Sequence, residues 1–409
     1  MSRKRSSSKH GLAGLVALFF FLGFGLLALR RGTWESAVPA VAVPGAILLT
    51  AWLLPLLFPL DQLLLSLANF LCALGMLILY ITRPSLALHQ MTAYGAGLVA
   101  MICTAVFVRR HSRRDNWAWI FAVLALTALG MPVLFGQEIN GARNWLDIGV
   151  LSLQPSEMVK PLLVFCLAVW MSERRWLPGL VFSVLCLLLL LLQKDLGTAL
   201  LYFAVSLLIG WMASGSLAVL AGGLLGGGAA ALWGYHHFAH VRRRVEIWID
   251  PWKDYQNAGY QLVQSLVALA SGGLFGVGLG LGAPDSIPIH TSDFIFSAIC
   301  EQFGLIFGAC VLLVYALLIW RGAAVARAAR YRFHGLLAMG AVLFLGLQAF
   351  LIIGGVLKLI PLTGITLPLV SYGGTSMVSS FCLLGLIQGV DSLNREALEE
   401  DTHLAMLGS

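Results

Sequence analysis

This sequence contains few charged residues. Of its 409 residues only 11% are Asp, Glu, Lys or Arg, while 59% are hydrophobic. A soluble domain carries about 25% charged residues, so this composition excludes a soluble domain with a single anchor. Apolar runs of bilayer-spanning length recur along the whole chain. The composition therefore indicates an all-α polytopic membrane protein.

Cysteines in loops are also missing. All seven cysteines lie inside apolar runs, which excludes a disulfide framework or a thiol zinc site in the loops. A cleavage site is missing too, because the first apolar run, Gly11–Leu29, ends at Arg30 and Arg31 instead of small residues. We interpret this run as an uncleaved first span.

The net charge of +7 does not indicate nucleic-acid binding. The basic residues form short clusters between apolar runs, and such clusters orient spans in a membrane. The membrane itself is therefore the partner that this charge predicts, and we expect no nucleic acid.

About twelve spans are predicted. They lie near residues 12–29, 37–58, 62–82, 91–108, 117–135, 157–172, 177–192, 196–212, 217–234, 294–320, 335–357 and 367–390. A further apolar segment, 261–281, is interrupted by serines and glycines. If it also crossed the membrane, the basic run 321–332 would leave the side of the other basic runs, so we expect 261–281 to lie at the surface or to re-enter.

Twelve spans place both termini in the cytoplasm. The connections that then face outside are 136–155, 193–195, 235–292 and 358–366. Arg30 and Arg31 also fall outside, which is the one exception to the positive-inside pattern.

Two carboxylates mark the run that begins near residue 294. Asp293 opens this run, and Glu301 follows eight residues later, on nearly the same helix face and two turns deeper. An ionisable group within or at the mouth of a span is costly to desolvate, so these acids indicate a functional site.

Other charged residues converge on the same predicted outer face. Glu157 and Lys160 share one side of a helix start, and Asp195 lies in a tight turn between two spans. They can be ion pairs that fix helix register. They can equally serve transfer from a lipid-linked diphosphate, with a carboxylate as general base and Lys160, Arg143 or the run 242–244 holding phosphate.

The order of motifs resembles the SEDS proteins (shape, elongation, division and sporulation), which include RodA and FtsW. The residues that carry the resemblance are Asn140–Trp145, Gln154–Lys160, Asp195–Ala199, Arg244–Pro251, Gly259–Ser265, Ser271–Gly276, Asp293–Phe296 with Glu301, and Pro361–Ser376. The resemblance implies a core of ten helices. Residues 1–58 then form a basic N-terminus and two additional helices, 59–392 the core with an extracellular loop at about 235–292 and membrane-peripheral helices, and 393–409 a cytoplasmic tail.

The resemblance also implies an activity. Family members are peptidoglycan glycosyltransferases that polymerise lipid II at the outer face of the bacterial plasma membrane, together with a class B penicillin-binding protein. The family's essential acid maps onto Asp293, which is expected to act as general base while undecaprenyl diphosphate leaves. His290 is given no role, and elongation, division and sporulation all stay open.

The remaining site residues are assigned as expected substrate contacts. Lys160 and Arg143 are candidates for the diphosphate, and Glu157 and Asp195 either orient Lys160 or bind a divalent cation, Mg²⁺ or Mn²⁺. Glu301 either tunes Asp293 or pairs with a buried cation. Arg244 and Ser371 complete the substrate-binding set.

Two other functions compete with the enzyme. Twelve spans with intramembrane Glu and Lys also suit a transporter that flips lipid II, and a scaffold that only recruits the penicillin-binding protein is a third hypothesis. The ionisable residues crowd one side while the inner halves of the spans are largely apolar, which favours chemistry at the surface.

Overall fold

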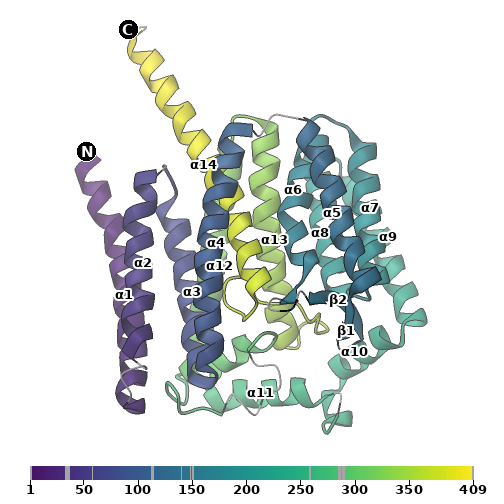
Figure 1. Ribbon diagram of the computed structural model, residues 1–409. Coiled ribbons are helices and arrows are strands. Elements are labelled where there is room, and N and C mark those ends of the chain that lie inside the picture. The colour runs from purple at the N-terminus through teal and green to yellow at the C-terminus, as the bar shows by residue number, and fades with distance from the viewer. Residues whose placement is uncertain are drawn as a thin grey trace.

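The computed structural model describes residues 2–407 apart from 33–36, 58, 112–114, 140, 148, 150–151, 258, 284–286 and 288–290. Twelve of its helices coincide with the predicted spans (Figure 1). They are α1 (Ser2–Arg31), α2 (Val38–Leu57), α3 (Gln62–Thr82), α4 (Pro84–His111), α5 (Asp115–Phe135), α6 (Pro155–Ser172), α7 (Trp176–Leu192), α8 (Leu196–Ser214), α9 (Leu217–His237), α12 (Ile295–Arg327), α13 (Arg332–Val356) and α14 (Gly374–Leu407).

The all-α polytopic fold is confirmed. Eleven helices of the described chain are long and apolar enough to cross a membrane, and α7 is a shorter apolar helix of 17 residues. The interior of the bundle contains α3, in which 89% of an 18-residue stretch is buried, whereas Gly234 is the one buried residue of α9. Because α9 is nonetheless apolar, its surface is suited to lipid.

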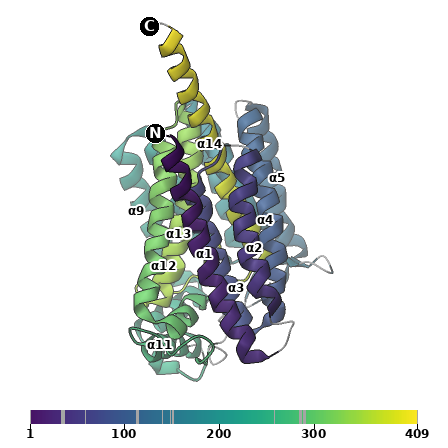
Figure 2. The same ribbon diagram turned by 90° about the vertical axis from the view of Figure 1, so that its left-hand side faces the viewer.

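The two termini lie at the same end of the bundle, and the irregular elements gather at the other end (Figures 1 and 2). These elements are the strands β1 (Gln137–Ile139), β2 (Ala142–Asp147) and β3 (Ser152–Leu153), the helices α10 (Ala239–Ile249) and α11 (Tyr260–Gly272), and the 3₁₀ turn η2 (Pro251–Asp254). The strands form one antiparallel sheet in the order β1-β2-β3. We refer to this end of the bundle as the loop end.

Helix α11 forms most of the first half of the segment 261–281, which is predicted not to be a span. It has 13 residues, too few for a span, and it lies across the loop end of the bundle (Figure 1). The helical part of this segment is therefore not a span, as predicted.

Several boundaries differ from the prediction. Helix α4 begins at Pro84 and not near residue 91, and α12 extends to Arg327 and not only to residue 320. The last span begins at Gly374 and not near residue 367, because the preceding segment contains Pro368 and does not form a helix. The predicted tail from residue 393 continues α14 without a break as far as Leu407.

Arg31 has a structural reason to lie at the loop end. Its guanidinium donates to the carbonyls of Tyr80 (2.9 Å) and Ile81 (3.1 Å) at the end of α3, and it stacks over the Tyr80 ring. Cations are favoured at helix C-termini, where the last carbonyls lack helical partners. Helix capping therefore gives a structural reason for one of the two arginines that are exceptions in the predicted topology.

The orientation of the loop end can be tested by cysteine labelling. Phe275 follows α11 and is 82% exposed. In a background without native cysteines, we expect Phe275→Cys to react with a membrane-impermeant maleimide in intact cells. A matched Glu399→Cys on the α14 extension should react only after permeabilisation. The opposite pattern would overturn the topology.

Candidate functional site

Asp293 lies in the turn Thr291–Phe294 that precedes α12. Its side chain is half-buried, and the Ser292 hydroxyl donates to Asp293 Oδ1 at 2.9 Å. Burial raises the pKa of Asp293 to about 6, and the Ser292 hydrogen bond and the Arg244 charge oppose this rise. A carboxyl group with such a pKa can accept a proton near neutral pH.

Ser371 holds this turn in place. Its hydroxyl donates to the Ser292 carbonyl at 2.5 Å, and the neighbouring Tyr372 N–H donates to the Thr291 carbonyl at 2.9 Å. Gln90 on α4 donates in turn to the Ser371 carbonyl at 2.9 Å. The contacts of Ser371 are therefore those of a residue that positions the turn beside Asp293.

Arg244 on α10 approaches Asp293 across Gly364. The guanidinium donates to the Thr363 carbonyl at 2.9 Å. Gly364 has φ +71°, and a Cβ placed there would lie 3.7 Å from Arg244 Nη2 and 3.8 Å from Asp293 Oδ2. A glycine therefore suits both the backbone conformation and the space that the Asp293 carboxylate and the Arg244 guanidinium flank.

Asp195 forms the N-cap of α8 and is buried. It accepts hydrogen bonds from Thr198 N (3.2 Å), Asn144 Nδ2 (2.9 Å) and Gln154 Nε2 (3.4 Å). It also interacts electrostatically with Arg244. Asp195 thus joins the β2 strand and the start of α6 to the group formed by Arg244 and Asp293.

Lys160 and Glu157 form a buried ion pair inside the bundle. Lys160 Nζ lies 2.6 Å from Glu157 Oε2 and 2.7 Å from Gln348 Oε1 on α13. Gln348 Nε2 donates to the Thr366 carbonyl at 2.8 Å. The pair therefore supports the segment 361–373 from within, and the Lys160 ammonium does not project from the surface in this arrangement.

The side chains of Arg143 and Glu301 have other partners than Asp293, Arg244 and Asp195 among the described residues. Arg143 is exposed on β2, with its Nε 3.5 Å from Glu138 Oε2. Glu301 lies in α12, where its Oε1 accepts from the Ala283 N–H at 3.1 Å. No ion pair among the described residues includes Glu301, so a cationic partner for it is not found in this part of the chain.

The sequence interpretation missed Ser292 and Gln348. A buried lysine needs acceptors, and Gln348 is a polar residue within an otherwise apolar run, which is a signal that could have identified it. Asn140 and His290 lie outside the described residues.

No group of three His, Cys, Asp or Glu side chains converges within the described ranges. A Mg²⁺ or Mn²⁺ at this site would therefore share its ligands with phosphate oxygens of a substrate, as Mg²⁺ commonly does.

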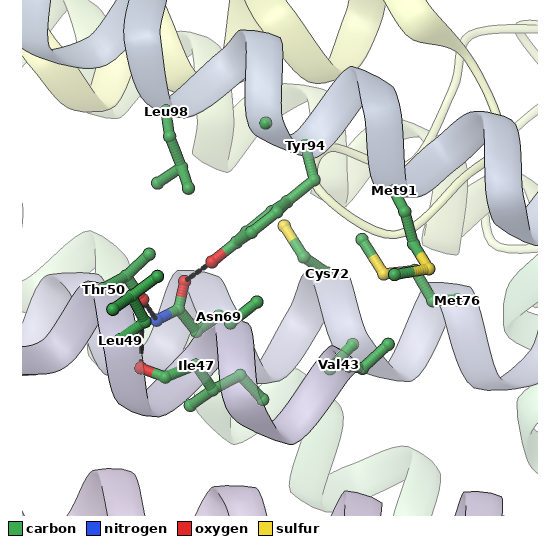
Figure 3. Close-up of a pocket in the computed structure, with 13 residues that line it drawn as sticks. Val43, Ile47, Leu49, Thr50, Asn69, Cys72, Met76, Met91, Tyr94 and Leu98 are labelled. Atoms are coloured by element: carbon green, nitrogen blue, oxygen red, sulfur yellow. Dashed lines mark hydrogen bonds between the residues drawn. The ribbon is translucent and has the colours of Figure 1, made fainter. Parts of the chain in front are cut away.

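A cavity of about 260 Å³ lies between α2, α3 and α4 (Figure 3). Its polar side chains bond to one another: the Tyr94 hydroxyl donates to Asn69 Oδ1 at 2.9 Å, and Asn69 Nδ2 donates to Thr50 Oγ1 at 3.0 Å. The described residues that line it include no Asp, Glu, Lys, Arg or His. It therefore lacks the acid–base groups that the turn at Asp293 provides.

Comparison with known proteins decides the family. Residues 60–396 match the model of the "Cell cycle protein" family that comprises FtsW, RodA and SpoVE. The chain belongs to this family. The resemblance to the SEDS proteins is thereby confirmed, and α1 and α2 lie outside the matched region.

Individual SEDS relatives carry enzyme names. Over 339 residues the chain is 34% identical to the peptidoglycan glycosyltransferase RodA of Mycobacterium tuberculosis, covering 77% of this chain and 72% of the relative. It is 38% identical over 285 residues to a probable peptidoglycan glycosyltransferase FtsW of Halorhodospira halophila, covering 66% and 71%.

One solved structure shows the shared fold. It describes the coordination of polymerization and crosslinking by a peptidoglycan synthase complex, and a chain in it is 28% identical, with a TM-score of 0.70. The match covers 83% of this chain and 98% of that chain.

Breaking the buried ion pair should lower the free energy of unfolding of the protein. Glu157→Gln leaves the Lys160 charge without its counter-charge, so we expect a loss of about 3–5 kcal/mol in stability. Thermal unfolding in detergent measures this loss. The double variant Glu157→Gln/Lys160→Met should recover most of it, and an unchanged unfolding temperature in the single variant would contradict the role of the pair.

Proposed function

We propose that this SEDS protein is a peptidoglycan glycosyltransferase that polymerises lipid II at the loop end of the bundle. One observation carries the proposal: a half-buried carboxylate with a pKa of about 6 and a cation flank the same glycine, Gly364. A base and a phosphate-binding cation at one membrane boundary are what glycosyl transfer from a lipid-linked diphosphate requires.

In this mechanism Asp293 removes the proton from an acceptor sugar hydroxyl. The oxygen attacks the anomeric carbon of a second lipid-linked disaccharide, and a new glycosidic bond forms as the bond to the diphosphate breaks. Undecaprenyl diphosphate leaves with the electron pair, and Asp293 then releases its proton to water. A single displacement inverts the configuration at the anomeric carbon.

Arg244 is the proposed principal contact of the diphosphate. Its guanidinium lies beside Gly364, as the Asp293 carboxylate does, and it interacts electrostatically with Asp293. Arg143 is exposed at the same end and can contact the outer part of the headgroup. The segments that carry the site are held in place by Glu157, Lys160, Asp195 and Ser371. Glu301 binds the chain that precedes the Asp293 turn.

The proposed location is the bacterial plasma membrane, with both termini cytoplasmic and the loop end outside. The termini share one end of the bundle, and the site lies at the other. The proposed partner is a class B penicillin-binding protein, because a related chain belongs to a complex that couples polymerization to crosslinking.

The assignment of Asp293 can be tested with purified protein. Asp293→Asn keeps the shape of the side chain but removes the base, so we expect lipid II polymerisation to fall by about 100-fold or more. Gel analysis of glycan products from the protein with its partner measures this. Asp147→Asn, an exposed acid on β2, is the matched control and should remain active.

Full polymerisation by Asp293→Asn would refute the role of Asp293 as base. If the wild-type protein moves labelled lipid II across vesicles and makes no polymer, the transporter is correct instead. A complex that does neither would support the scaffold.

The pH dependence follows from the raised pKa of Asp293. The base acts when deprotonated, so the rate should rise as pH increases through about 6. Ser292→Ala removes the hydrogen bond that lowers this pKa, so the midpoint should move to higher pH. Ser271→Ala on α11 is the control. A midpoint that stays in place or moves down in Ser292→Ala would contradict this assignment.

A further inference from the structure

Helix α12 is broken shortly after it begins. Gly304 has φ 87° and ψ 169°, which interrupts the helical hydrogen bonds. The segment 273–283, here called the glycine segment, supplies the missing partners. The bonds are Val277 N to Glu301 O (2.9 Å), Gly278 N to Gln302 O (3.1 Å), Leu305 N to Gly273 O (2.9 Å) and Ile306 N to Leu274 O (3.2 Å).

Two side chains of α12 hold the rest of the glycine segment. Gln302 Oε1 accepts from the Gly280 N–H at 2.6 Å, and Glu301 Oε1 accepts from the Ala283 N–H at 3.1 Å. The glycine segment is thereby attached to the short helical stretch 295–303, which begins two residues after Asp293. The direction of this stretch determines where the turn with Asp293 lies.

Helix α1 contacts both the break and the glycine segment. Arg30 Nη1 donates to the Gly280 carbonyl at 2.6 Å. The centroid of the Phe19 ring lies 6.4 Å from that of Phe303 and 6.0 Å from that of Phe307. These two phenylalanines lie on either side of Gly304. Figure 2 shows α1 crossing the face of the bundle toward the end where α11 lies.

This contact is not part of the family's common core. The family match begins at residue 60, so α1 lies outside it, whereas the glycine segment and Gly304 lie within it. Arg31 fixes the end of α1 to α3 independently, through the carbonyls of Tyr80 and Ile81. The side chain of the neighbouring Arg30 therefore binds the glycine segment and is not needed to attach α1 to α3.

We propose that α1 is a built-in clamp on the α12 break, with Arg30 as a positioning residue that holds the glycine segment and, through it, the turn that carries Asp293. The expected effect of the clamp on the reaction rate rests on the proposed glycosyltransferase function. That α1 holds the glycine segment follows from the contacts of Arg30 and Phe19.

Hydrogen exchange tests the clamp without relying on activity. In the full-length protein in lipid nanodiscs, Arg30→Ala should increase exchange of the amides in peptide 276–283. Arg30→Lys keeps a donor for the Gly280 carbonyl and should restore most of the protection. Leu29→Ala, at a neighbouring position that is 84% exposed, is the matched control and should exchange like wild type.

Kinetics test whether the clamp positions the reaction. In lipid II polymerisation we expect Arg30→Ala to lower kcat about fivefold with KM unchanged, the size expected for one hydrogen bond. Arg30→Lys should recover the rate.

Each outcome decides a separate point. Unchanged exchange in Arg30→Ala would refute the clamp, and faster exchange with unchanged kcat would refute the positioning role. If the wild-type protein makes no polymer, the proposed function is refuted. The hydrogen-exchange comparison of wild type and Arg30→Ala then still tests the clamp.

Discussion

A charge or backbone group without a partner is costly in an apolar interior, and this cost shapes the bundle. The Lys160 ammonium is buried only because Glu157 and Gln348 surround it. The break at Gly304 is accommodated because the glycine segment supplies its hydrogen bonds. The Asp293 turn and α10, which carry the proposed reactive groups, lie at the loop end of the bundle.

The candidate site depends on supports that come from distant parts of the chain. Gln90 on α4 holds Ser371, and Ser371 holds the turn next to Asp293. The Lys160 pair reaches the segment 361–373 through Gln348 and Thr366. Such preorganisation keeps the carboxylate and the cation at Gly364 in a fixed relation, which is what a reaction governed by electrostatic stabilisation requires.

Much of this could be predicted from the sequence. The spans follow from apolar runs of sufficient length, and the arrangement of the basic clusters predicted that the segment 261–281 is not a span, which agrees with the short helix α11. Asp293 could be selected because a charge at the mouth of a span is costly. The family motifs then indicated the activity that related proteins carry.

The remainder depended on tertiary contacts. The direction of the Lys160 side chain follows from a partner on α13, almost two hundred residues away, which no local pattern reveals. The sequence predicts Glu301 on one helix stripe with Asp293, but Asp293 lies in the turn before α12 and is not helical. The break at Gly304 brings the glycine segment against Glu301. The short sheet at β1–β3 and the late start of α14 depend on loop geometry, where apolar periodicity carries no signal.

The most direct measurement is an experimental structure of the protein with a lipid-linked diphosphate substrate bound. The account predicts diphosphate oxygens within hydrogen-bonding distance of the Arg244 guanidinium, and an acceptor hydroxyl about 3 Å from Asp293. A headgroup bound at the end of the bundle where the termini lie, or in the cavity between α2, α3 and α4, would contradict it.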